Sequence, residues 1–211
     1  MSVTKPCAQR CEGDARAVVR EAIRLGYRHI DTAYLYHNED NVGLGIADVI
    51  NEGLVRREDL FVVSKLPSQG HRRERVLYFL KKSLASLQLD YLDLYLIHTP
   101  FHIEPEDGND DEPKEPIPDS NTDYLQTWKG MEDCVRLGLT KSIGLSNFNS
   151  LQILDIYKNA TIKPSNLQVE CHPYLAQNEL LAVCRELDIT VTAYAPLGSP
   201  FLPDMMRNNG L

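Results

Sequence analysis

The sequence has no run of about 18 apolar residues, the length that a membrane-spanning helix requires, so it predicts no transmembrane segment. Its first residues, MSVTKPCAQR, also lack the apolar stretch of a secretory signal peptide. Positive charge is in deficit, because 22 Lys and Arg stand against 30 Asp and Glu and give a net charge of −8. Nucleic acids and anionic membranes select basic surfaces, so we expect neither as a partner. These absences together favour a cytosolic (cytoplasmic) protein.

The cysteines are not arranged for metal binding. The five cysteines form no CxxC pair and have no histidine nearby at the spacing of zinc ligands. Their odd number favours reduced thiols over a disulfide framework.

A nucleotide-binding loop is missing as well. The string GLGIAD at positions 43–48 imitates part of a dinucleotide fingerprint, but it lies inside a helical pattern and follows no strand. We therefore expect neither a metal site nor a Rossmann domain.

Six short apolar runs are present, and each ends at or near a polar residue of a kind that takes part in chemistry. Helix-like segments separate the runs at nearly regular intervals. Nearly unbroken apolar runs are typical of parallel strands that helices cover on one face and a packed barrel interior covers on the other. The runs are HIDTAY, LFVVSK, LYLIH, SIGLSN, NLQVE and ITVTAY. This pattern predicts an α/β fold of the (β/α)8 TIM-barrel type.

The length of the chain bears on how complete such a barrel is. A complete (β/α)8 barrel occupies about 200 to 400 residues, and 211 residues lie at the lower edge of that range. The prediction is therefore a single domain over residues 1–211 that contains an incomplete barrel of about six parallel strands.

An acidic segment follows the third of these runs. It reads TPFHIEPEDGNDDEPKEPIPDSN and contains eight acidic residues and one lysine. Two interpretations stay open. The segment is either a solvated loop or a lid, since it leaves a strand on the side where the chemical groups gather.

Four polar residues follow three successive runs and predict one pocket. Asp31 and Tyr36 follow the first run, Lys65 ends the second and His98 ends the third. In a parallel barrel such groups meet, because the carboxyl ends of the strands lie together. Each residue alone has an ordinary explanation: Asp31 as a cap or ion-pair partner, Tyr36 and His98 as polar edges of the core, Lys65 as a surface charge.

Together these four residues form an arrangement that can donate a proton to an oxygen atom. A tyrosine hydroxyl has a reference pKa of about 10 and donates a proton poorly at neutral pH, but a nearby ammonium favours the ionised form and lowers such a pKa. Lys65 would tune Tyr36 in this way, and Asp31 would hold Lys65 in place. A neutral His98 could donate a hydrogen bond to a carbonyl oxygen of a substrate.

With these residues the chain resembles the aldo-keto reductase family. The stretch GYRHIDTAYLYHNEDNVG (26–43) is similar to the first signature of that family, and KSIGLSNF (141–148) to the end of its second. The family's tetrad of aspartate, tyrosine, lysine and histidine matches Asp31, Tyr36, Lys65 and His98. The resemblance implies NADPH-dependent reduction of an aldehyde or ketone, a small-molecule carbonyl substrate, with Tyr36 as the proton donor. His172 lies in ECHPYL, which resembles a strand of the family, so we do not expect it to bind a metal.

The resemblance also implies contacts to NADP(H). Ser146, Asn147 and Gln168 would hydrogen-bond the carboxamide, and Tyr194 would stack on the nicotinamide ring. Plain strand residues are the alternative interpretation of Gln168 and Tyr194. The full set of implied cofactor contacts is Asp31, Ser146, Asn147, Gln168, Tyr194 and, along the pyrophosphate, Leu197 and Ser199.

The chain departs from the family pattern at both ends. No counterpart of the first and eighth strands, or of the basic motif that grips the adenosine 2′-phosphate, is recognisable. Unpaired sheet edges would then favour self-association. The alternative to an active reductase is a catalytically impaired truncated isoform, or a non-catalytic nucleotide-binding or interaction subunit.

Overall fold

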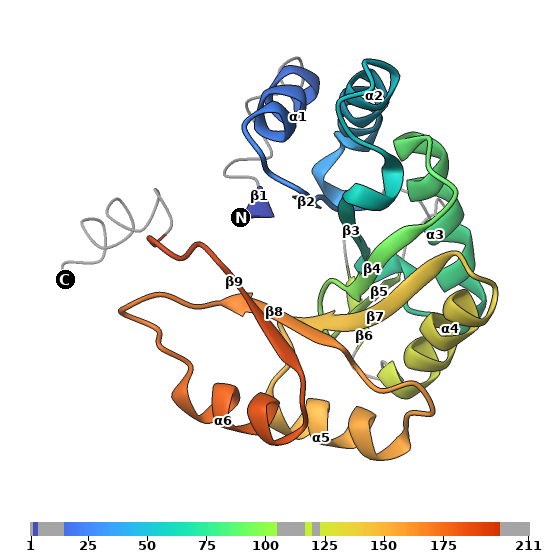
Figure 1. Ribbon diagram of the computed structural model, residues 1–211. Helices are drawn as coiled ribbons and strands as arrows, with labels where there is room; N and C mark the ends of the chain where they lie inside the picture. The colour runs from blue at the N-terminus through green and yellow to red at the C-terminus, as the bar shows by residue number, and fades with distance from the viewer. Residues whose placement is uncertain (1, 4–14, 105–116, 120–122, 199–211) are drawn as a thin grey trace.

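A seven-stranded parallel sheet organises the computed structural model, which describes residues 2–3, 15–104, 117–119 and 123–198 (Figure 1). Each strand pairs in parallel with its neighbours in the order β1-β2-β3-β4-β7-β8-β9. The strands are β1 (Ser2–Val3), β2 (His29–Asp31), β3 (Phe61–Leu66), β4 (Leu92–Ile97), β7 (Thr140–Ser146), β8 (Asn166–Glu170) and β9 (Thr190–Tyr194).

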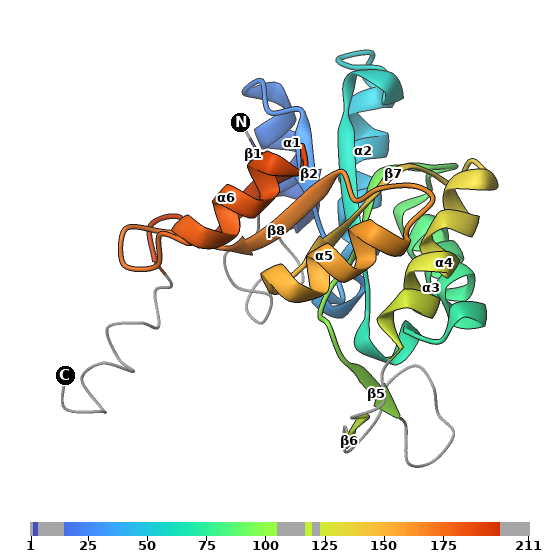
Figure 2. The same cartoon turned by 90° about the horizontal axis from the view of Figure 1, so that it is seen from below.

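In the residues that the structure describes, six α-helices lie along the outer side of this curled sheet. Figure 1 shows them as an arc around the strands, with α1 and α2 at one end and α5 and α6 at the other, and Figure 2 shows α3 and α4 side by side. In the described part of the chain, no helix is long and apolar enough to cross a membrane. The helices are α1 (Ala15–Arg24), α2 (Glu39–Asn51), α3 (Arg73–Leu87), α4 (Tyr124–Arg136), α5 (Ser150–Asn159) and α6 (Asn178–Glu186). Three short 3₁₀ helices connect them to strands: η1 (Tyr34–Tyr36), η2 (Arg57–Asp59) and η3 (Ser68–Gly70).

The predicted fold class is confirmed: the sheet is an open part of a (β/α)8 barrel, and each of the six apolar runs contributes a strand, although in HIDTAY the strand ends at Asp31. The structure adds one strand. The two residues of β1 pair with His29 and Ile30 of β2, so the sheet begins one strand earlier than the sequence indicates. No strand follows β9 among the described residues.

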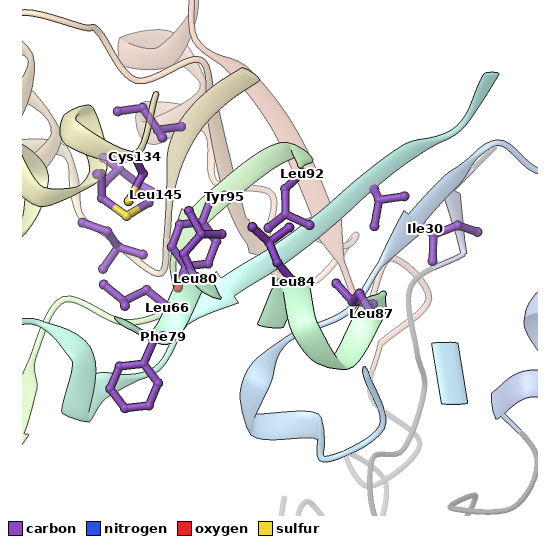
Figure 3. Packing of buried hydrophobic residues seen from close by; sticks show 14 of the residues in the cluster. Ile30, Leu66, Phe79, Leu80, Leu84, Leu87, Leu92, Tyr95, Cys134 and Leu145 are labelled. Atoms are coloured by element: carbon purple, nitrogen blue, oxygen red, sulfur yellow. The ribbon is translucent and has the colours of Figure 1, made fainter. Parts of the chain in front are cut away.

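The main hydrophobic core fills the space between the sheet and the helices. Figure 3 shows Leu80, Leu84 and Leu87 of α3 gathered with Leu92 and Tyr95 of β4, and all five belong to one buried cluster. Full burial of an aliphatic or aromatic side chain contributes about 1.5–3 kcal/mol, so this layer is the main source of stability. Among the described residues, a small apolar cluster lies on the opposite face of the same strands: Val63, Leu94 and Leu96. The polar groups of the candidate site lie on that face.

The glycines of the GLGIAD string serve helix packing. Gly43 and Gly45 lie within α2, as the sequence analysis expects. A Cβ atom on Gly43 would lie 2.7 Å from the Cα of Leu87 at the end of α3, and one on Gly45 would lie 2.8 Å from the carbonyl oxygen of Arg16 on α1. Neither glycine belongs to a phosphate-binding turn. Their spacing reflects the close approach of three helices.

The two ends of the acidic segment pair with each other as a small antiparallel hairpin. Strand β5 (His102–Glu104) pairs with β6 (Ile117–Asp119), and residues 105–116 and 120–122 lie outside the described part of the chain. The ring of His102 is buried, and its Nδ1 lies 2.9 Å from the carbonyl oxygen of Ser68, in the turn after β3. The hairpin is therefore anchored beside the carboxyl ends of β3 and β4.

Candidate active site

A buried lysine–aspartate pair forms the centre of the site. Asp31 ends β2 and Lys65 lies near the end of the neighbouring strand β3, so the two side chains leave the sheet side by side. Lys65 has no exposed surface, and its ammonium donates to Oδ1 of Asp31 and, at 2.9 Å, to the carbonyl oxygen of Thr32. Burying a lone ammonium would cost several kcal/mol, so this site depends on the carboxylate beside it.

The Tyr36 hydroxyl lies next to the ammonium. Tyr36 ends the 3₁₀ helix η1, which directly follows β2, and its oxygen is 3.4 Å from Nζ of Lys65. The same ammonium lies 4.9 Å from the centre of the Tyr36 ring. Both contacts bring positive charge to the phenol, and a positive charge there stabilises any negative charge that develops on its oxygen.

His98 completes the group of four. It follows β4, and its ring meets the Tyr36 ring edge to face, with centroids 5.8 Å apart. Burial, and then the nearby Lys65 ammonium, lower the pKa of His98 to about 3. The imidazole is therefore neutral at ordinary pH and carries one N–H donor. Its Nδ1 is buried without a hydrogen-bond partner in the described part of the protein.

Two amide side chains extend the site across the strands. Gln168 on β8 donates from Nε2 to Oδ2 of Asp31 at 2.7 Å. Asn147 follows β7 in a left-handed backbone conformation, with φ of 66°. Its Nδ2 donates to the carbonyl oxygen of His98 at 2.9 Å and to the hydroxyl of Ser146 at 3.2 Å. Amide and hydroxyl groups from β7 and β8 are thus brought to the same end of the sheet as the four residues above.

Tyr194, at the end of β9, lies next to the amide group of Asn147. Its hydroxyl donates to Oδ1 of Asn147 at 2.9 Å. Burial and the nearby Glu170 carboxylate raise the pKa of Tyr194. Leu197 is not brought to the others, because its side chain is 98% exposed on the segment after β9. Ser199 lies outside the described residues.

The structure reveals another buried carboxyl group, that of Glu39, which is not among the predicted site residues. Glu39 lies in the first turn of α2, and its Oε1 accepts a hydrogen bond of 2.6 Å from the hydroxyl of Ser64, which precedes Lys65 on β3. Burial raises the pKa of Glu39. An acidic residue in the first turn of a helix usually lies at the surface, where it interacts favourably with the helix dipole. The residue type and position of Glu39 therefore do not predict that it is buried.

His172 has a protein partner. Its Nε2 lies 2.9 Å from a carboxylate oxygen of Glu170, and its ring meets that of Tyr174. Among the described residues, no group of three or more His, Cys, Asp or Glu side chains is placed to hold a metal ion.

A groove of about 710 Å³ opens beside Asn147 and Tyr194. It lies between the carboxyl ends of β7, β8 and β9 and the first turns of α5 and α6. Asn147, Phe148, Asn149, Ser150, Val169, Glu170, Leu175, Gln177, Asn178, Glu179, Leu180 and Tyr194 line it.

The fold and the site together define a (β/α)-barrel protein with a tyrosine hydroxyl held beside a buried lysine–aspartate pair at the carboxyl ends of its strands. The family model described as "Aldo/keto reductase family" matches residues 8–210. The chain therefore belongs to the aldo/keto reductase family.

Individual relatives agree with this assignment. The chain is 50% identical over 192 residues to aldo-keto reductase family 1 member A1 of Gallus gallus, a match that covers 89% of this chain and 58% of the relative. It is 48% identical over 185 residues to aldo-keto reductase AKR2E4 of Bombyx mori, with 88% and 57% covered. The crystal structure of that Bombyx mori protein in complex with NADP superposes with a TM-score of 0.80 at 41% identity, over 96% of this chain and 69% of that one. The chain thus spans a little under three fifths of the length of these curated relatives.

Proposed function

We propose that this chain reduces aldehydes or ketones to alcohols with NADPH as the hydride donor. The observation that carries the proposal is the placement of the Lys65 ammonium 3.4 Å from the Tyr36 hydroxyl, with the neutral His98 ring against the same phenol. Membership of the aldo/keto reductase family and the likeness to a relative in complex with NADP support the choice of reaction and cofactor.

The residues present fit a nicotinamide cofactor. Ser146, Asn147 and Gln168 offer hydroxyl and amide groups, which are the donors and acceptors that a carboxamide requires. Tyr194 offers an aromatic ring at the end of the next strand. When bound, NADPH supplies a hydride. In this proposal Ser146, Asn147 and Gln168 hold the carboxamide, and the Tyr194 ring packs on the nicotinamide.

The residues of the tetrad then have distinct tasks. Tyr36 gives its hydroxyl proton to the substrate oxygen as that oxygen becomes an alcohol. Lys65 stabilises the phenolate that Tyr36 leaves behind, and Asp31 fixes the position of Lys65. His98, being neutral, donates an N–H to the carbonyl oxygen and orients it toward Tyr36 without competing as an acid.

The test is a comparison of the chain with Tyr36→Phe. The substitution removes only the hydroxyl, so the reductase rate with NADPH and a panel of aldehydes should fall by about a hundredfold or more, which is the usual contribution of a general acid. NADPH binding should change little, because the phenyl ring keeps its contact with Lys65. A variant that retained most of the wild-type rate would exclude Tyr36 as the proton donor.

We also propose a reducing compartment such as the cytosol as the place of action. Cys134, Cys171 and Cys184 are free thiols in the structure, and unpaired cysteines are typical of proteins from reducing surroundings.

A further inference from the structure

Tyr36, the proposed proton donor, lies in a short connection between a strand and a helix. Strand β2 ends at Asp31, α2 begins at Glu39, and the 3₁₀ helix η1 that carries Tyr36 lies between them. A proton donor must lie within hydrogen-bond reach of the group that it protonates. Misplacement of a reacting group by about 1 Å can slow a reaction about a hundredfold. The contacts that fix the two ends of this connection therefore bear on the chemistry of Tyr36.

The first end of the connection is held to β3 on the face of the candidate site. The Lys65 ammonium donates to the carbonyl oxygen of Thr32 at 2.9 Å, in addition to its bond with Asp31. The backbone N–H of Thr32 donates to the carbonyl oxygen of Val63 at 2.9 Å. The Thr32 hydroxyl also donates to Oδ1 of Asn38 at 3.1 Å, so the connection closes on itself.

The second end is held to the same strand on its opposite face. Oε1 of Glu39 accepts the hydrogen bond of 2.6 Å from the hydroxyl of Ser64, and the two residues have 5% and 0% of their surface exposed. Successive residues of a strand point to opposite faces of the sheet. Ser64 shares its face with Val62, which belongs to the main core, whereas Lys65 faces the site. Two consecutive residues of β3 thus hold the two ends of the connection that carries Tyr36.

A carboxyl group is a costly choice for this buried position. Burial raises the pKa of Glu39, and the hydrogen bond from Ser64 opposes that shift. The charged side chains that act on this carboxyl group are Asp40 of α2 and Lys65 of β3, and Tyr95 of β4 is a further titratable neighbour. An apolar side chain would fill the space between α2 and β3 without the cost of burying a polar group. Packing alone therefore does not account for a glutamate here.

We propose that Glu39 is a positioning residue for the proton donor: the hydrogen bond that it accepts from Ser64 fixes the second end of the connection to β3. This bond thereby sets the distance of the Tyr36 hydroxyl from the Lys65 ammonium. The inference rests on the proposed function. It adds that a buried contact between the sheet and α2, on the face opposite to the site, controls the alignment of the two reacting groups.

Three substitutions separate positioning from charge. Glu39→Leu removes the acceptor, Ser64→Ala removes the donor, and Glu39→Gln keeps an acceptor oxygen for Ser64 but cannot carry a charge. Stopped-flow measurement of a single turnover, with NADPH and one aldehyde, isolates the chemical step from product release. The same rate measured in H₂O and in D₂O gives the solvent isotope effect, and fluorescence titration gives the dissociation constant of NADPH.

Glu39→Leu and Ser64→Ala should each lower the single-turnover rate by at least about tenfold, because the Tyr36 hydroxyl is no longer held in place. The double variant should be little slower than either single variant, since both substitutions remove the same bond. The solvent isotope effect should increase in these variants, because donation of the proton then limits the rate more strongly.

The other two readouts should change little. The dissociation constant of NADPH should change by less than about twofold in these variants, because the proposed carboxamide contacts lie on β7 and β8. Glu39→Gln should keep a rate within about threefold of the wild type, since it still accepts the hydrogen bond from Ser64. A slower chemical step with unchanged cofactor binding, restored by the conservative variant, is a result that general loosening of the structure does not produce.

A buried glutamate on another helix provides the matched control. Glu132 of α4 has 3% of its surface exposed, and its Oε1 accepts hydrogen bonds from the backbone N–H groups of Thr161 and Ile162. These partners lie between α5 and β8, not in the connection that carries Tyr36. Glu132→Leu should lower stability but leave the single-turnover rate and the solvent isotope effect unchanged.

The inference is overturned if either Glu39→Leu or Ser64→Ala reduces the aldehyde at the wild-type rate. It is also overturned if Glu39→Gln is as slow as Glu39→Leu, since the carboxylate would then act through its charge. If Glu39→Leu does not fold, the rate of Ser64→Ala and its restoration to the wild-type value in Glu39→Gln decide the question. A wild-type chain that reduces no aldehyde overturns both this inference and the proposed function. A wild-type chain that reduces aldehydes, with Glu39→Leu slowed no more than Glu132→Leu, overturns the inference alone.

Discussion

Lys65 is the residue on which both the stability and the chemistry of the site depend. Its ammonium is fully buried against Asp31, so replacing it leaves a buried carboxylate without its counter-ion. We expect Lys65→Met to lower the free energy of unfolding by about 3–5 kcal/mol. Adding Asp31→Asn should recover much of that loss, because no uncompensated charge remains.

Urea unfolding of the two single variants and the double variant measures this coupling. Reduction of aldehydes should not return in the double variant, since the ammonium beside Tyr36 is still missing. Equal and additive effects of the two substitutions on unfolding would contradict a coupled pair.

Two buried histidines make stability depend on pH. Burial is the main cause that lowers the pKa of His98 to about 3 and the pKa of His71 to about 3. In the unfolded chain a histidine has a pKa near 6.5, so below that pH the unfolded chain binds protons that the folded chain does not. The free energy of unfolding should therefore fall as pH falls, by about 2 kcal/mol for each of these histidines between pH 7 and pH 5.

Denaturant unfolding at a series of pH values checks this expectation. His71→Asn should remove about half of the pH dependence that the two residues cause, because its ring no longer titrates in the unfolded chain. A wild-type stability that stays constant or rises on acidification over this range would contradict buried, neutral imidazoles.

The strand-end positions of Asp31, Tyr36, Lys65 and His98 were sufficient to predict that they meet, since parallel strands bring their carboxyl ends together. The link between Asp31 and Gln168 could not be predicted in the same way. It depends on how far the sheet curls, and no local pattern in the sequence encodes that curvature. The bond from Ser64 to Glu39 is of the same kind, because it joins a strand to a helix through their tertiary packing.

Among the elements, α2 shows how closely the helices approach each other. A Cβ on Gly43 would overlap the backbone of Leu87 at the end of α3. Gly to Ala within a helix normally stabilises by about 0.5–1 kcal/mol, but overpacking costs about 1–3 kcal/mol. We expect Gly43→Ala to be destabilising overall, and thermal unfolding measures the sign.

The exposed end of the same helix offers a control. Asn51→Ala, where the side chain is exposed, should change the free energy of unfolding by less than about 0.5 kcal/mol. A Gly43→Ala variant that unfolds at a higher temperature than the wild type would contradict the close packing of α2 on α3.

The elements that could be predicted were those with a strong apolar pattern. Each of the six apolar runs contains a strand, because a strand covered on both faces needs an almost continuous apolar sequence. The pairing of β1 with β2 and the pairing of β5 with β6 were not predicted. These strands have only two or three residues each, and β5 and β6 border an acidic, proline-rich segment, so no periodic pattern marks them.

At the scale of the whole sheet, β9 has a single partner strand among the described residues, whereas every strand of a closed barrel has two. Only β8 pairs with β9 in the described part of the chain, and Ala193 is exposed along that strand. Unpaired strand edges favour pairing between chains, so we expect concentration-dependent self-association. Lysine on an edge strand opposes such pairing, and Ala193→Lys should shift the protein toward monomer.

Sedimentation velocity over a range of protein concentrations measures this directly. Wild-type protein that stays monomeric at the highest concentration would contradict this expectation, because it would show that the edge of β9 does not pair with another chain.

The central claim is that the carboxyl ends of these strands form a working nicotinamide site beside the Tyr36 hydroxyl. Titration of the chain with NADPH, followed by the fluorescence of the cofactor, tests it most directly. We predict saturable binding that weakens in Gln168→Met and persists in Tyr36→Phe. A folded protein that shows no saturable binding of NADPH would contradict the claim.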